Sequence, residues 1–258
     1  MEFKGKVVIV TGGTQGIGKC IAECFARESA TVHVIDVQEG PWFVGDLADK
    51  ATLERFAADV VAKSGKVDVL VNNALPLFKG INECSYEEFA YAQAVGVVAP
   101  FYLAKLFKDS FAEGASIVNI SSSRDRMSQP QSESYTAAKG GIAALTHALA
   151  ASLAGSVRVN SISPGWIDTS FRKYDGPDAL FYADYAKPQG FCDEAWKAIY
   201  QYVFALAHGA DKSLFYYGDW IKKPGVAIVS CNDGLRPVIM KLEATNEESK
   251  IDYEPVER

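Results

Sequence analysis

The sequence predicts an α/β fold in which a doubly wound parallel sheet forms a single domain. Short apolar runs rich in β-branched residues alternate with longer segments whose apolar residues recur at helical spacing. A glycine-rich turn joins the first run to the first of the longer segments. Such alternation is typical of parallel strands joined by helices that cover both faces of the sheet.

The first strand is expected at residues 6–10, where a β-branched run ends in Thr11-Gly12-Gly13. The helical spacing of Ile21, Cys24 and Phe25 predicts the helix that follows. The expected strands are residues 6–10, 31–37, 67–72, 115–121 and 157–163, and the expected helices are 17–28, 49–64, 86–109 (curved near Gly96 and Pro100) and 135–154. Ligands of such sheets bind at the carboxyl ends of the strands, where the candidate residues fall.

Residues 171–258 differ in character from the rest, since 15 of the 30 aromatic residues lie there. Residues 171–190 are expected to form a loop or short helices over a pocket. Residues 193–208 are expected to be helical, and residues 243–258 to be a loose polar tail. The aromatic residues Tyr174, Phe181, Tyr182 and Tyr185 are candidates to close a substrate pocket, or are simply core or interface residues.

Composition limits the classes of function. A chain of 258 residues with 48% apolar and 22% charged residues suits one soluble domain, and no apolar run reaches the ~18–20 residues of a membrane span. The net charge of −6 argues against nucleic acid as the main partner. The apolar start leads into a glycine turn and does not resemble a signal peptide. Five cysteines, an odd number, suit reduced thiols and a cytoplasmic location.

Cys20 and Cys24 lie four residues apart on an expected helix. We interpret them as a small packed face and not as a metal-binding pair, because no zinc-type spacing follows them. No metal site is therefore predicted.

The segment TGGTQGIG, residues 11–18, stands between the first strand and the first helix. Its glycines allow a tight turn and a close approach of the backbone to a pyrophosphate, which the helix N-terminus attracts. The sequence thus predicts a dinucleotide site. Its candidate contacts are Gly12, Thr14, Gln15, Gly16, Ile17 and Gly18.

The acid at the end of the second strand, Asp36, indicates which dinucleotide is preferred. A carboxylate accepts bonds from both ribose hydroxyls of NAD and repels a 2′-phosphate, so NAD is expected over NADP. Asp46 and Leu47 are candidates to hold the adenine. The alternative is that Asp46 caps the helix expected at residues 49–64.

Tyr135 and Lys139 lie four residues apart and so face the same side of a helix. An ammonium beside a phenol favours phenolate and lowers its pKa, which lets the phenol act as a base. Ser122, thirteen residues before Tyr135, is a candidate to hydrogen-bond the substrate oxygen. The alternative is an exposed helix pair without chemistry. Arg124 and Arg126 contact either an acidic substrate or solvent, and solvent is favoured.

Several of these motifs, in this order and spacing, resemble the short-chain dehydrogenase/reductase family. The matching elements are TGGTQGIG, Asp36, Asp46, Asn72-Asn73-Ala74, NISSS, YTAAK, Asn160 and Pro164-Gly165. The likeness covers residues 4–170, and residues 171–258 diverge. It implies a Rossmann-type fold with a seven-stranded parallel sheet and an atypical C-terminal region, and a homodimer or homotetramer.

The resemblance also implies a role for each matching residue. Tyr135 is expected to be the general acid/base, Lys139 to lower its pKa and hold the nicotinamide ribose, and Ser122 to orient the substrate oxygen. Asn160 is expected to brace the sheet. The other expected cofactor contacts are Asn72 and Ala74 on the adenosine side and Pro164, Gly165, Ile167 and Thr169 on the nicotinamide side.

The chain departs from the family pattern in three places. Gly96 stands where the family has an Asn that holds a water beside the Lys, so reduced activity is expected. Leu75-Pro76 follows Ala74 in place of the usual glycine. Residues 215–225 faintly resemble the family's last strand, but Lys222-Lys223-Pro224 interrupts them, and Pro inside a central strand is disfavoured. Residues 226–230 are the alternative strand, so the last third is either a rebuilt sheet or an addition.

The sequence therefore predicts an NAD-dependent oxidoreductase that interconverts a secondary alcohol and a ketone. Its expected substrate is a small molecule, with no nucleic acid or membrane as partner. The alternative is a dinucleotide-binding protein with little or no turnover, which serves as a sensor or scaffold.

Overall fold

The structure, a computed structural model, describes residues 3–164 with their side chains and the backbone of residues 212–217, 226–231 and 237–241. The strands of the main sheet are β1 (Val7–Thr11), β2 (Thr31–Asp36), β3 (Phe43–Val44), β4 (Val67–Asn72), β5 (Phe111–Ile120) and β6 (Val157–Ile162). The α-helices of this part are α1 (Gly16–Arg27), α2 (Lys50–Ser64), α3 (Tyr86–Gln93), α4 (Ala99–Leu106) and α5 (Glu133–Ser152).

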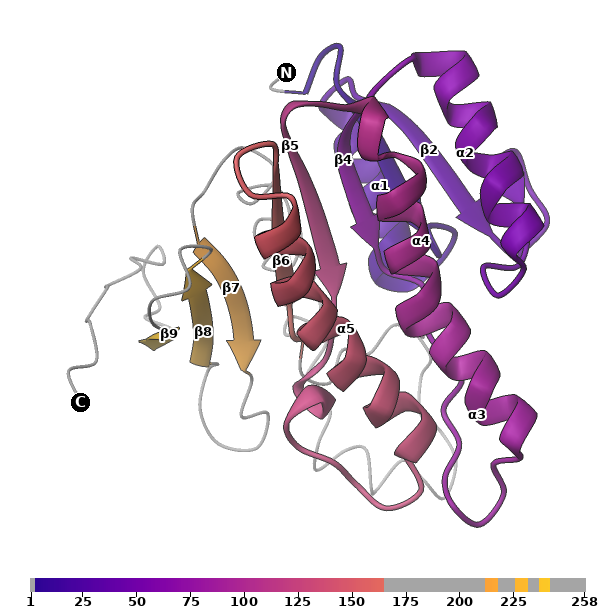
Figure 1. Cartoon of the computed structure of the whole chain (residues 1–258), viewed down its shortest axis with the longest axis vertical. Coiled ribbons are helices and arrows are strands. Elements are labelled where there is room, and N and C mark those ends of the chain that lie inside the picture. Colours follow the sequence, from indigo (N-terminus) through magenta and orange to yellow (C-terminus); the bar gives the residue numbers. More distant parts are fainter. Residues whose placement is uncertain (1–2, 165–211, 218–225, 232–236, 242–258) are drawn as a thin grey trace, which may run out of the picture.

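The sheet is parallel throughout and has the strand order β3-β2-β1-β4-β5-β6 (Figure 1). The first strand of the chain is thus central, and the order runs outward from it in both directions. This confirms the predicted doubly wound sheet. Its topological switch point lies between β1 and β4, where such sheets open a crevice at their carboxyl ends.

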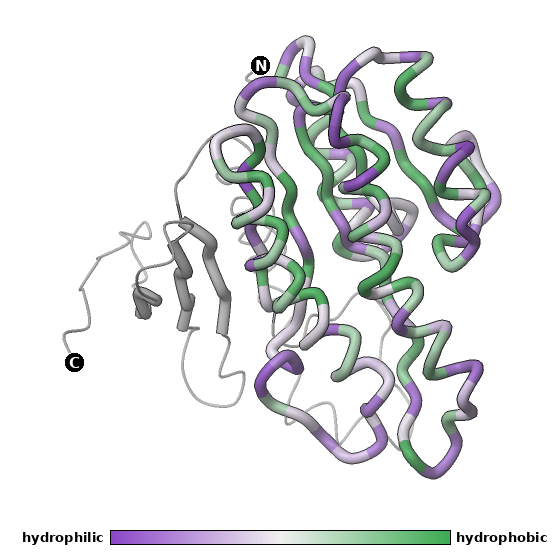
Figure 2. The backbone as a smooth tube through the Cα atoms, viewed as in Figure 1, coloured by the Kyte–Doolittle hydropathy of each residue, from purple (hydrophilic) through white to green (hydrophobic). Residues whose placement is uncertain are grey.

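Two hydrophobic clusters lie on the two sides of the sheet. Ile21 and Phe25 of α1 pack with Val8 and Val10 of β1 in one cluster. The other cluster joins α2, α4 and α5 to the opposite side chains of the strands. Its members include Ile9, Leu53, Phe56, Leu70, Leu103, Ile117 and Leu149. Both faces of the central strands β1 and β4 are therefore buried, which explains why most of their residues are apolar (Figure 2).

Side-chain hydrogen bonds fix the starts of α2 and α3. Asp49 caps α2 by accepting bonds from the N–H groups of Ala51 and Thr52. Ser85 and Glu88 form a reciprocal capping box at the start of α3. The helix cap of α2 is thus Asp49, and the alternative that Asp46 caps this helix is wrong.

The helix expected at residues 86–109 is a continuous helical segment that changes pitch. A π-turn at Ala94–Val98 joins α3 to α4 and contains Gly96. The segment Tyr86–Leu106 is long and apolar enough, by length and composition, to cross a membrane. Its buried residues Ala99, Leu103 and Ala104 belong to the same core cluster as α2, whereas Phe89, Val98 and Phe101 are exposed.

The prediction from the sequence misplaced some element boundaries and missed one strand. The short edge strand β3 was not predicted, because two residues are too few to show a pattern. Strand β5 begins at Phe111, four residues earlier than expected, and α5 begins two residues earlier, at Glu133.

The last three described strands do not extend the parallel sheet. The strands β7 (Lys212–Tyr217), β8 (Val226–Cys231) and β9 (Pro237–Lys241) form a separate antiparallel sheet. The expected seventh parallel strand is therefore not supplied by residues 226–230, which are the centre of this second sheet. The predictions for residues 171–190, 193–208 and 243–258 fall outside the described residues.

Candidate functional site

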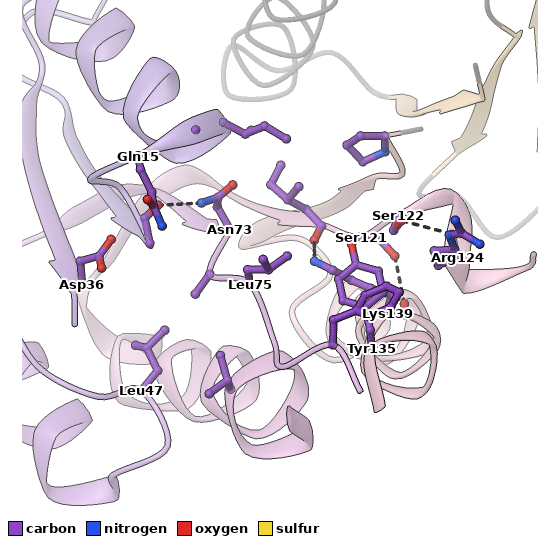
Figure 3. Close-up of a pocket in the computed structure, with 18 of the residues that line it drawn as sticks. Gln15, Asp36, Leu47, Asn73, Leu75, Ser121, Ser122, Arg124, Tyr135 and Lys139 are labelled. Carbon is purple, nitrogen blue, oxygen red and sulfur yellow. Dashed lines mark hydrogen bonds between the residues drawn. The ribbon is translucent and has the colours of Figure 1, made fainter. Parts of the chain in front are cut away.

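A cavity of about 930 Å³ opens at the carboxyl ends of the strands (Figure 3). It extends from the loops after β1 and β2 to the start of α5 and the turn after β5. The predicted residues that line it are Gly12, Gln15, Gly16, Ile17, Asp36, Asp46, Leu47, Ala74, Ser122, Tyr135, Lys139 and Pro164. Twelve predicted site residues, from distant parts of the chain, thus share one cavity.

The glycine loop forms a close-fitting cradle at one end. Gly12 and Gly16 have φ values of +63° and +56°, a conformation that favours glycine. A Cβ on Gly12 would come within 2.8 Å of the Ala74 Cα. At the start of α1, Gln15 makes no side-chain capping bond and the first turn carries no acid, so the helix amides are suited to an anion.

Asp36 lies at the end of β2 and is 8% exposed. Its Oδ2 accepts bonds from the N–H and hydroxyl of Thr14, at 3.2 and 2.8 Å, and its Oδ1 accepts one from the Gln38 N–H at 3.1 Å. Thr14 itself does not line the cavity. Its two hydrogen bonds hold the Asp36 carboxylate, which does line the cavity. This supporting role was not predicted.

The second Asn of the Asn72-Asn73 pair joins the glycine loop to β4. Asn73 donates from Nδ2 to the carbonyls of Thr11 and Gly12, at 3.1 and 2.9 Å, and it lines the cavity. Asn72 instead points into the sheet, where it donates to Asn119 Oδ1 at 2.8 Å. The expectation that Asn72 lines the cofactor side is corrected to Asn73.

Asp46 lines the cavity and is held by two neighbours. Its carboxylate accepts bonds from the Ala48 N–H at 2.8 Å and from the Tyr91 hydroxyl at 3.2 Å. Burial and this carboxylate together raise the pKa of Tyr91, so the phenol stays protonated and donates. Tyr91 is a lining residue that sequence reasoning missed, because nothing in α3 marks the face that turns to the cavity.

Ser122, Tyr135 and Lys139 meet at the other end of the cavity. Ser122 is buried at the end of β5, and its Oγ accepts a bond from the Arg124 N–H at 3.2 Å. Tyr135 and Lys139 share one face of α5, with the Lys139 Nζ 5.6 Å from the centre of the Tyr135 ring. The i,i+4 spacing thus brings the pair together, and the alternative of an exposed helix pair is wrong, because Lys139 is 4% exposed.

The electrostatics of this pair differ from the expectation. Burial raises the pKa of Tyr135, and hydrogen bonding by Ser122 together with the charge of Arg124 only partly opposes this. Burial lowers the pKa of Lys139 to about 8, against a smaller opposing effect of Asp125. The Lys139 Nζ donates to the Ile120 carbonyl at 2.6 Å. The expected lowering of the Tyr135 pKa is therefore wrong for the chain alone, since desolvation of the phenol outweighs the nearby charges.

The two departures from the family pattern that lie near α5, Gly96 and Pro76, are packed against each other. A Cβ on Gly96 would lie 2.7 Å from the Ala138 Cβ and 3.2 Å from the Pro76 Cβ. Gly96 and Pro76 therefore fit as a pair, and an Asn side chain has no room at position 96. Beside them is a cavity of about 10 Å³, near the size of one water molecule, lined also by Asn72 and Lys139.

One segment connects the two ends of the large cavity. Residues 73–79 run from the glycine loop to the start of α5. At the far end, the Lys79 N–H donates to Ser134 Oγ at 2.8 Å, and the Ser134 N–H donates to the Lys79 carbonyl at 3.1 Å. Ser134 immediately precedes Tyr135. Between these ends, Leu75 and Phe78 line the cavity.

The remaining predicted contacts are placed as follows. Gly18 is buried behind the loop and does not line the cavity, although it sets the position of Gly12. Gly165, Ile167 and Thr169 lie outside the described residues. Arg124, for which solvent was favoured, lines the cavity, whereas Arg126 has an exposed side chain next to Asp125.

Comparisons with known proteins show the family to which the chain belongs. A family model described as enoyl-(acyl carrier protein) reductase matches residues 12–190. An uncharacterised oxidoreductase of Thermotoga maritima is 37% identical over 188 residues, which cover 65% of this chain and 73% of that protein. The chain belongs to the short-chain dehydrogenase/reductase family.

Other relatives of this short-chain dehydrogenase/reductase differ in cofactor. The human 15-hydroxyprostaglandin dehydrogenase [NAD(+)] is 34% identical over 194 residues, covering 66% of this chain and 71% of that protein. An apo SCOR enzyme from Clostridium thermocellum is 35% identical, with a TM-score of 0.63, and covers 84% of this chain and 96% of that one. A Burkholderia cenocepacia short-chain dehydrogenase in complex with NADP has a TM-score of 0.69 at 24% identity, with 79% and 92% coverage, and supports the fold alone.

Proposed function

We propose that this oxidoreductase interconverts a secondary alcohol and a ketone, with NAD as the hydride carrier. The observation that carries the proposal is that Ser122, Tyr135 and Lys139 line the same cavity as the glycine loop and Asp36. A dinucleotide bound with its pyrophosphate at the α1 N-terminus would extend along this cavity toward Tyr135. When bound, NAD supplies the acceptor or donor of hydride.

The chain's own residues would hold the substrate and move the proton. Ser122 donates a hydrogen bond to the substrate oxygen, and the Tyr135 hydroxyl takes or gives the proton at that oxygen. The Lys139 ammonium stabilises the phenolate that forms. Because Tyr135 has a raised pKa in the chain alone, this proton transfer depends on positive charge close to the phenol.

Asp36 supports NAD over NADP. It is the acid that lines the cavity at the end of β2, where a ribose of the dinucleotide would lie. Among the described lining residues the cations are Arg124 and Lys139, and both lie at the opposite end. A 2′-phosphate would therefore meet a carboxylate without a compensating cation from these residues.

A titration of the protein with NADH and with NADPH, followed by nicotinamide fluorescence, tests the cofactor part. Tight NADH binding with weak NADPH binding is expected, and preference for NADPH would overturn the argument from Asp36. A screen of secondary alcohols with NAD then tests turnover. The second candidate function, a dinucleotide sensor without turnover, is favoured by Gly96 and by the raised pKa of Tyr135. Binding without turnover across a broad panel would support it.

A buried acid beside the site gives a pH prediction. The side chain of Asp125 is 2% exposed, and its Oδ2 accepts a bond from Ser163 Oγ at 2.8 Å. Its charge opposes the lowering of the Lys139 pKa. Asp125→Asn should therefore move the Lys139 pKa below about 8, so that the ammonium is lost at a lower pH. The alkaline fall of kcat/KM should shift to lower pH.

The measurement is kcat/KM as a function of pH for wild type and Asp125→Asn. Asp109→Asn, an exposed acid outside the site, is the charge-matched control and should leave the profile unchanged. An alkaline limb that stays in place, or moves to higher pH, would contradict this account of Lys139.

A further inference from the structure

Arg124 places a positive charge beside the reacting centre. It lies in the 3₁₀ turn Ser123–Asp125, two residues after Ser122, and its backbone N–H is bound to Ser122 Oγ. Its side chain lines the cavity and donates to Gln129 Oε1. The guanidinium is close enough to the Tyr135 hydroxyl to lower its pKa against the effect of burial.

Among the described residues Arg124 forms no ion pair, although acids are near. The neighbouring Asp125 accepts from Ser163 and lies 3.8 Å from Arg126 Nε. Of the acids that line the cavity, Asp36 ends β2 and Asp46 follows β3, the strand beyond β2, whereas Arg124 follows β5. Three strand spacings separate β2 from β5, or roughly 14 Å, so these acids are too far away to pair with Arg124.

Three large apolar side chains form part of the cavity wall. Leu75, Phe78 and Met127 line the cavity although they are 72%, 44% and 47% exposed. The Phe78 ring centre lies 5.2 Å from that of Tyr135. Exposed apolar side chains that gather at a ligand cavity are suited to the apolar part of a ligand.

We propose that the substrate is a hydroxy acid or oxo acid, with its carboxylate on Arg124 and its hydrocarbon chain against Leu75, Phe78 and Met127. This inference rests on the proposed function and adds the substrate class. Two N–H groups of a guanidinium can donate in parallel to the two oxygens of one carboxylate. Because Arg124 adjoins Ser122, the carboxylate lies one or two carbons from the reacting carbon, as in 2- and 3-hydroxy acids.

In the oxidative direction the reaction balances. The substrate C–H bond breaks, and its electron pair leaves with the hydrogen to oxidised NAD. The hydroxyl proton passes to Tyr135 and the carbonyl forms, which gives an oxo acid, NADH and one proton released to solvent. The carboxylate and its pairing with Arg124 are unchanged through the step, so Arg124 binds and orients the substrate.

Matched acids and esters test the inference. The substrates are 2- and 3-hydroxyhexanoate and their methyl esters, assayed with NAD for wild type, Arg124→Met and Arg124→Lys. Hydrogen bonds to a charged group are expected to favour one of the acids over its ester about 10- to 100-fold in kcat/KM. Arg124→Met should reduce this ratio to about one, and Arg124→Lys should retain part of it. Arg126→Met, the exposed neighbour, should leave it unchanged.

An ester turned over as well as its acid by wild type, or a ratio unaffected by Arg124→Met, would overturn the substrate class and leave the proposed function standing. Calorimetric titration of the NADH-saturated protein with hexanoate and with methyl hexanoate separates binding from turnover. If hexanoate binds more tightly in an Arg124-dependent way but no alcohol is oxidised, the carboxylate site stands and the proposed function fails. Equal binding of the two probes rejects the carboxylate site in either case.

Discussion

Replacing Tyr135 with Phe should reduce kcat/KM by roughly 100- to 10,000-fold, the usual contribution of a general acid/base. The variant keeps the ring that stacks near Phe78 at 5.2 Å but loses the hydroxyl that would carry the proton. NADH binding should be almost unchanged, because the contacts of the glycine loop and Asp36 lie at the other end of the cavity.

The measurement combines steady-state turnover with NADH fluorescence titration of the same preparations. Tyr102→Phe is the matched control, since it removes a phenol that donates only to Glu54 on the protein surface. It should turn over like wild type. Turnover by Tyr135→Phe within tenfold of wild type would refute Tyr135 as the proton-transferring group, even if the fold and the cofactor site are as described.

Replacing Gly18 with Ala should disrupt both the glycine loop and dinucleotide binding. A Cβ there would lie within 3.0 Å of the Gly12 carbonyl carbon and oxygen and of Asn73 Nδ2. These neighbours are backbone or hydrogen-bonded, so they cannot move aside without shifting the loop. Overpacking of this kind costs about 1–3 kcal/mol. The free energy of unfolding should fall by about that amount, and NADH affinity should fall steeply.

Urea unfolding and NADH titration of Gly18→Ala measure the two effects. Gly140→Ala is the matched control, because Gly140 is also helical and, among the described residues, a Cβ there would meet only the Asp125 carbonyl oxygen, at 3.9 Å. This control should be neutral or stabilising by up to ~1 kcal/mol, the difference in helix propensity. Equal stability and NADH affinity of Gly18→Ala and wild type would show that the loop is not as tightly packed as described.

Most of the fold could be predicted from the sequence because its central strands are buried on both faces. Such strands are predominantly apolar, and Val67–Asn72 was located to the residue. The two-residue strand β3 has no such signal, since its pairing with β2 depends on the fold that surrounds it. The sequence left open whether the last third rebuilds the main sheet or is an addition, because an apolar run such as 226–230 does not reveal which sheet it joins. The separate antiparallel sheet of β7, β8 and β9 agrees with an addition.

The candidate site could be predicted where the spacing of a motif fixes which residues meet. It could not be predicted where the orientation or the pKa of a side chain depends on how deeply it is buried. The i,i+4 spacing predicted that Tyr135 and Lys139 meet, and they do. Whether Asn72 or Asn73 faces the cavity depends on the residue at which β4 ends. Because the sequence does not show this, Asn73 was missed. The direction of the Tyr135 pKa depends on how deeply the phenol is buried, and a sequence carries no direct measure of that.

The segment of residues 73–79 has a consequence for the order of kinetic events. Asn73 holds the carbonyls of the glycine loop, and Lys79 is paired with Ser134 directly before Tyr135. A dinucleotide bound to the glycine loop, as proposed, would therefore also constrain Leu75, Phe78 and the first turn of α5, where the proposed substrate would bind. Under the proposed function, this linkage favours compulsory-order addition, in which the dinucleotide enters first and leaves last.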